Sequence, residues 1–126
     1  MKYEWMDAYL LGKKGVRKDF KAEWNWQRYM IADKMFAAVC YDDQNRPVLI
    51  TLKLEPAEGD LLRRLHEDII PGYYMNKIHW NSVKVDGNIS DDMLKVLLDK
   101  SYALTISDLE LSIIIGNLLD NAIEAC

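Results

Sequence analysis

The spacing of apolar side chains changes along the chain, and each spacing predicts a different element. Near the start, Tyr3, Met6 and Leu10 recur at intervals of three and four residues, as on one face of an α-helix. Gly12 and Gly15 follow, and glycine is common just past the C-terminal end of a helix. We therefore expect a first helix over residues 3–11.

Three segments in the next part of the chain predict β-strands: residues 24–31, 34–41 and 48–54. They are rich in aromatic and apolar residues, and in the third every even-numbered residue is apolar, which is the period of a half-buried strand. Short polar segments at residues 32–33 and 42–47 have the composition of turns. Three strands joined by such turns predict an antiparallel meander.

A helix is expected to begin at Pro56, because proline at the first helical position loses no hydrogen bond. We expect the turn at Pro71 and Gly72 to end this helix, and residues 80–85 to form another strand. The predicted apolar stripe of the helix consists of Leu61, Leu62, Leu65 and Ile69.

The last third of the chain predicts two helices. Ser90 is a candidate N-cap for a helix that ends near Tyr102. The spacing of Ser107 and Glu110 is that of a capping box, and residues 109–125 are apolar on nearly every side. A helix of this kind is expected to be buried within its own domain or against a partner. The predicted fold class is α+β, an antiparallel β-sheet packed against helices on one face, with an extra apolar C-terminal helix.

Composition limits the classes of function. With 126 residues the chain has the size of one domain. Its formal net charge is −4, and the excess of acidic residues lies after residue 85, which disfavours non-specific nucleic-acid binding. Basic residues cluster early, at Lys13, Lys14, Arg17, Lys18 and Lys21.

The cellular setting follows from what the sequence lacks. We find no apolar run of membrane-spanning length and no basic-then-apolar leader at the N-terminus. Cys40 and Cys126 are far apart and form no CxxC motif, which argues against a disulfide framework or a zinc site. We therefore expect a cytoplasmic protein without membrane contact, metal or cofactor.

The polar and aromatic residues of the segment 70–85 are the main candidates for chemistry. His79 stands next to Trp80, but neither it nor His66 has an evident nucleophile or acid partner. Tyr73, Tyr74 and Trp80 are able to stack on a flat ligand, although aromatic residues more often cover the edge of a sheet. Asn76 and Lys77 are able to hold an anion or to cap the loop. No catalytic constellation is evident, so an enzyme is the least favoured interpretation.

Several blocks together resemble a known family. They are RYMIADKMFA at residues 28–37, Leu52-Lys53, PGYYMNK at residues 71–77, His79-Trp80, Asp86-Gly87 and Ser101-Tyr102. In order and spacing this pattern resembles the MmcQ/YjbR-like family over about residues 3–108. The resemblance implies a CyaY-like fold in a bacterial protein and a role in binding DNA, with two hairpins described as a double wing. It places the wing turns near Lys34 and Arg46, and the polar residues of the motif at Lys53, Asn76, Lys77, His79 and Trp80.

The C-terminal segment has a different resemblance. The string IIIGNLLDNAIEA at residues 113–125 resembles the N-box helix of sensor histidine kinases, in which Asn117 and Asn121 would face nucleotide. The other ATP-binding boxes are not present in the sequence, so we expect no ATP binding by this chain. The resulting division is a domain at 1–108 and a helix at 109–126 that is not a domain by itself. Alternatives to DNA binding are a protein or small-ligand partner at residues 71–80, or a homodimer formed through the apolar C-terminal helix.

Overall fold

The computed structural model describes residues 1–72 and 76–125, and side chains as far as Glu110. Three helices and six strands make up this part of the chain. In chain order they are α1 (Met6–Leu11), β1 (Val16–Lys21), β2 (Trp26–Ile31), β3 (Lys34–Tyr41), β4 (Pro47–Lys53), α2 (Pro56–Leu65), β5 (Ile69–Pro71), β6 (Trp80–Lys84) and α3 (Asp91–Ala125).

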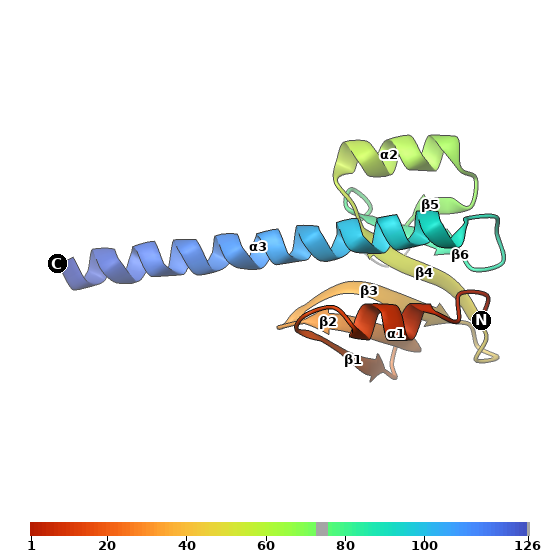
Figure 1. Ribbon diagram of the computed structural model, residues 1–126, viewed down its shortest axis with the longest axis horizontal. Coiled ribbons are helices and arrows are strands. Elements are labelled where there is room, and N and C mark those ends of the chain that lie inside the picture. The colour runs from red at the N-terminus through yellow and green to blue at the C-terminus, as the bar shows by residue number, and fades with distance from the viewer. Residues whose placement is uncertain (73–75, 126) are drawn as a thin grey trace.

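The strands form one sheet in the order β1-β2-β3-β4-β6-β5, and every neighbouring pair is antiparallel (Figure 1). Four consecutive strands joined by short connections pair with their chain neighbours, as expected for a meander. The strand β6 then adds beside β4, and β5 forms the far edge. The predicted α+β fold with an antiparallel sheet is confirmed.

One face of the sheet carries the main core. The pairing of β3, β4 and β6 places Ala37, Leu52, Ile50 and Val83 on this face. Side chains of α1 and α3 pack on them, and Leu62 of α2 lies against the same cluster. All three helices therefore cover the same face, as the sequence predicts. Fully buried members of this core are Tyr3, Met6, Leu10, Phe36, Leu94 and Leu98.

Two edge strands and one helix face differ from the sequence expectation. The strand β1 was not predicted, because charged residues dominate its six positions, and the three-residue β5 is too short to show a period. On α2, Leu61 and Leu65 are 53% and 65% exposed, so the predicted apolar stripe is wrong at these positions. The helix instead approaches the sheet through Gly59, where an added Cβ would lie about 3.0 Å from the Asn81 side chain.

The C-terminal helix is present, but it is not separate. A single helix, α3, runs from Asp91 to Ala125 (Figure 1). Ser90 caps it as predicted, because its hydroxyl oxygen accepts a hydrogen bond from the Met93 N–H at 3.1 Å. The predicted break between residues 102 and 107 is wrong, and Ser107 lies inside the helix. Packing explains the difference, since Thr105 is buried and Ile106 and Leu109 lie against the core across the expected break.

Candidate functional site

Most of the expected binding residues gather at one end of the sheet. Lys53 is the last residue of β4 and pairs with Trp80, the first residue of β6. Leu52 pairs with Ala37, so Lys34 at the start of β3 lies beyond the same end. Residues 76–79 lead directly into β6. We call this region the lysine end of the sheet, defined by Lys14, Lys34, Lys53 and Lys77.

Lys53 joins the lysine end to α3. Its ammonium lies 2.7 Å from a carboxylate oxygen of Asp108. Its backbone N–H donates to the hydroxyl of Ser101 at 2.9 Å, and that hydroxyl in turn donates to the carbonyl of Phe36. The charge of Lys53 is therefore compensated within the protein, and Ser101 fixes the position of the helix against β3 and β4.

The segment before β6 is held mainly by its backbone. The Asn76 side-chain oxygen accepts the N–H of Ile78 at 2.9 Å, and the Asn76 carbonyl accepts the N–H of Trp80 at 2.9 Å. The carbonyl of His79 accepts the N–H of Leu54 at 2.8 Å. His79 and Trp80 are half-buried, whereas Asn76 is exposed. The other expected residues of this segment, Tyr73 and Tyr74, lie outside the described residues.

Three lysines at this end carry uncompensated charge. Lys14, Lys34 and Lys77 are exposed, and in residues 1–72 and 76–110 none of them forms an ion pair. The Lys14 carbonyl accepts the Tyr102 hydroxyl at 2.7 Å, which holds the α1–β1 connection against α3. Arg17 donates to the carbonyl of Ala32 at 3.0 Å beside the β2–β3 turn, but its charge is partly compensated by Asp19 at 3.8 Å.

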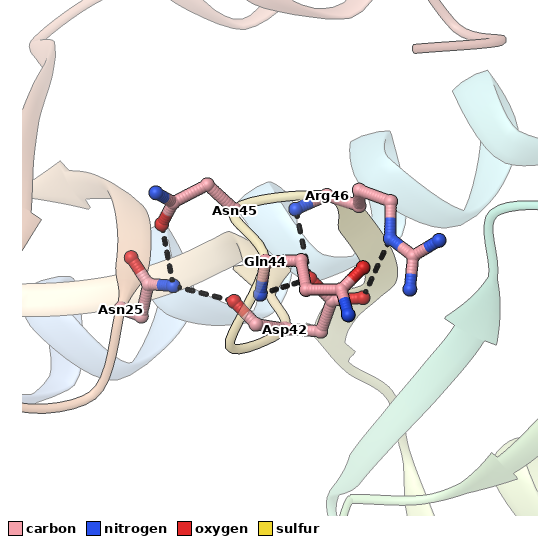
Figure 2. Close-up of polar contacts among 5 residues, drawn as sticks. All are labelled: Asn25, Asp42, Gln44, Asn45 and Arg46. Carbon is pink, nitrogen blue, oxygen red and sulfur yellow. Dashed lines mark hydrogen bonds and ion pairs between the residues drawn. The ribbon is translucent and has the colours of Figure 1, made fainter.

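Arg46 lies at the opposite end of the sheet, in the β3–β4 turn. Lys34 is the first of the eight residues of β3 and Arg46 follows the last, so the length of the strand, about 23 Å, lies between them. Figure 2 shows that Asp42 binds this turn together: its carboxylate accepts the backbone N–H of Arg46 at 2.9 Å and the Arg46 Nε–H at 3.1 Å. These bonds, the backbone bond of Arg46 first, lower the pKa of Asp42. The two proposed wing turns therefore do not form one surface.

A cavity on the helix-free face of the sheet was missed by the sequence analysis. It has a volume of about 280 Å³, and its walls combine Trp24, Trp26 and Leu49 with the polar side chains of Thr51 and Ser82. Cys40 also lines it, and burial raises the pKa of this thiol to about 11. At neutral pH Cys40 is therefore a thiol and not a nucleophilic thiolate. No local pattern predicts this cavity: Trp24 lies in the turn before β2, where Asn25 has a φ of 58°, and β4 and β6 lie beneath the two tryptophans only through strand pairing.

Two classes of feature are not found in the part of the chain that the structure describes. It contains no cluster of three or more His, Cys, Asp or Glu residues able to hold a metal ion. None of its helices combines the length and apolar character required to cross a bilayer.

The chain is similar in sequence to a known protein family and to proteins of Escherichia coli. A model of the YjbR family matches residues 11–104. The Escherichia coli K12 protein YjbR, described as uncharacterized, is 32% identical over 99 residues, which cover 79% of this chain and 82% of the relative. The Escherichia coli O157:H7 protein YbdF is 38% identical over 60 residues, or 48% of this chain and 49% of the relative.

Solved structures share the fold. A crystal structure of Deinococcus radiodurans protein DR2400, described as a DUF419 domain, superposes with a TM-score of 0.70 at 28% identity, covering 79% of this chain and 74% of that one. A Pseudomonas syringae protein superposes with a TM-score of 0.67 at 24% identity, covering 83% and 99%. None of these relatives bears an enzyme name. With three quarters of its length matched by the family model, the chain belongs to the YjbR family.

Proposed function

We propose that the protein is a non-enzymatic cytoplasmic module that binds DNA through the lysine end of the sheet. The observation that carries this proposal is the grouping of Lys14, Lys34 and Lys77, which are exposed at the same end and form no ion pair within the described residues. Such cations are able to neutralise phosphates and release counterions, which is the main source of sequence-independent affinity for nucleic acids.

The negative net charge does not contradict this proposal, because the charge is unevenly placed. The helix α3 begins with Asp91 and Asp92 at the end of the sheet that holds Arg46, and it reaches the lysine end near Ser101. At that far end burial raises the pKa of Tyr3, whose hydroxyl donates to the Ile89 carbonyl, and the coulombic effect of Asp91 and Asp68 raises this pKa further. The lysine end also holds Asp33, exposed next to Lys34, and Asp108, paired with Lys53, so we expect a modest preference of a polyanion for this end.

Salt dependence tests the proposal. Three phosphate contacts predict a log–log salt slope of about −2.7, and therefore an affinity about 40-fold lower at ~200 mM than at ~50 mM salt. We would measure fluorescence anisotropy of labelled duplex and single-stranded DNA at both concentrations. No binding to either DNA at the lower salt would exclude the proposal.

Matched charge reversals locate the contact. Lys34→Glu and Lys77→Glu should each weaken binding and make the salt slope shallower by about 0.9 or more. Lys84→Glu is the control, because Lys84 is an exposed lysine paired with Leu49 at the far end of the sheet. Arg46→Glu should behave like this control. Equal loss of affinity in all four variants would indicate a net-charge effect and would contradict a contact at the lysine end.

The C-terminal part of α3 supports a second candidate, the formation of a homodimer. Figure 1 shows α3 continuing beyond the sheet at the end where β2 and β3 meet. The sequence of this extension is rich in Leu and Ile, and apolar helices of this kind are usually buried against another surface. Light scattering should then show a dimer that dissociates on dilution and that Ile114→Glu disrupts. A monomer at every concentration would exclude it.

A further inference from the structure

The cavity on the helix-free face of the sheet has the features of a ligand site that is independent of the lysine end. Trp24 and Trp26 form one wall, with their rings in an edge-to-face arrangement at a centroid distance of 5.3 Å. Trp24 is 49% exposed, which leaves a large apolar surface at the mouth of the cavity. Flat aromatic ligands cover such surfaces efficiently because two rings pack with favourable edge or offset geometry.

The polar side chains that line the cavity form a short chain of hydrogen bonds that ends at Ser82. The Thr51 hydroxyl lies 3.0 Å from the Ser82 hydroxyl and 3.4 Å from the sulfur of Cys40. These three groups carry three hydrogens but make only two contacts with one another, and the structure gives Ser82 no other side-chain partner among the described residues. Thr51 and Ser82 are 2% and 1% exposed. When Cys40 donates to Thr51 and Thr51 donates to Ser82, the free hydrogen is that of the Ser82 hydroxyl; in the reverse direction it is the weakly donating S–H of Cys40. A ligand acceptor beside Ser82 would stabilise the first direction.

Size and charge restrict the ligand further. A volume of about 280 Å³ is equivalent to about nine waters at liquid density and lies just below the usual range for drug-sized ligands. The residues that line the cavity include none with a formal charge. The small volume and the uncharged lining favour a neutral molecule of one or two rings over a nucleotide. Lys21 is a cation beside the mouth, with its ammonium 4.8 Å from the Trp24 ring centroid.

We propose that this cavity binds a small, neutral, planar heteroaromatic molecule, with its ring against Trp24 and Trp26 and a ring nitrogen or carbonyl oxygen accepting the hydroxyl hydrogen of Ser82. The aromatic wall supplies the apolar contact, and the Ser82 hydroxyl favours molecules that carry an acceptor. The site does not depend on DNA binding, since none of the four lysines of the lysine end lines it.

A pair of probes of nearly equal shape tests this inference. Quinoline has a ring nitrogen that accepts a hydrogen bond, and naphthalene has none. We would titrate each into the full ¹⁵N-labelled chain and follow the indole N–H signals of the tryptophans and the amide of Ser82. Saturable shifts at Trp24, Trp26 and Ser82, with quinoline binding roughly fivefold more tightly than naphthalene, are expected from one neutral hydrogen bond.

Three variants separate the hydrogen bond from the aromatic contact. Ser82→Ala should abolish the preference for quinoline while naphthalene still binds. Ser107→Ala, which removes an exposed hydroxyl on α3 away from the cavity, should leave both affinities unchanged. Trp24→Ala alters a half-exposed side chain and so preserves the fold, and it should weaken both probes. The inference is overturned if neither probe gives saturable shifts at the cavity, or if the preference for quinoline survives in Ser82→Ala.

Discussion

The continuity of α3 through Ser107 leads to a prediction in which two chemically identical substitutions on one helix have opposite effects. Ser90 precedes the helix, and its hydroxyl oxygen accepts the N–H of Met93 at 3.1 Å. Ser107 lies within the helix and is exposed. In Ser90→Ala an N-cap is lost, whereas in Ser107→Ala a helix interior gains a better helix former.

The magnitudes follow from this placement. Loss of a serine N-cap costs about 1 kcal/mol, and in a chain of this length that lowers Tm by about 4 °C. Replacing an exposed serine by alanine inside a helix stabilises it by about 0.5 kcal/mol, which raises Tm by about 2 °C. The two positions lie about 25 Å apart along the helix axis, so their effects should add in the double variant.

Thermal and urea unfolding followed by circular dichroism at 222 nm measures both effects. If a separate helix began after Ser107, as the capping-box pattern by itself indicates, Ser107→Ala would destabilise the protein by about 1 kcal/mol, like Ser90→Ala. That result would refute a continuous helix. An unchanged stability in Ser90→Ala would refute the N-cap.

Three further predictions concern how α3 is attached. Ser101→Ala removes the hydroxyl that bonds the Lys53 N–H and the Phe36 carbonyl. It should lower the free energy of unfolding by roughly 2 kcal/mol, measured from the urea midpoint. A loss below ~0.5 kcal/mol would contradict this role of Ser101. Burial raises the pKa of Asp99, but the hydrogen bonds from Lys13 and Tyr9 outweigh burial and lower this pKa overall. The ionised Asp99 therefore stabilises the fold fully above about pH 4, and this stabilisation is lost as the pH falls further. Asp99→Asn should therefore flatten the dependence of the free energy of unfolding on pH below about pH 4, and an unchanged profile would argue against this role of Asp99. A chain ending at residue 110 should keep a cooperative thermal transition close to that of the full chain, because the described core contacts lie before that point; loss of the transition would show that residues 111–126 belong to the core.

Sequence and tertiary structure contributed to the candidate site in different ways. The grouping of Lys34 and Lys53 at one end follows from the meander that the turns in the sequence predict, whereas residues 76–80 join them only through the pairing of β4 with β6. The separation of Arg46 from this group also follows once β3 is known to be a single uninterrupted strand. The cavity was not predictable in the same way, because Thr51 and Ser82 are 31 residues apart and meet only through the β4–β6 pairing.

The sequence by itself determined the central meander, the cap at Ser90 and the family of the protein, because each depends on residues that are close in the chain or on motifs in a fixed order. Tertiary structure decided the edge strands β1 and β5, which are stabilised by pairing and not by their own composition. It also decided that α3 continues through a segment with the local chemistry of a helix start, since packing of Thr105 and Leu109 against the core outweighs a capping preference of about 1 kcal/mol.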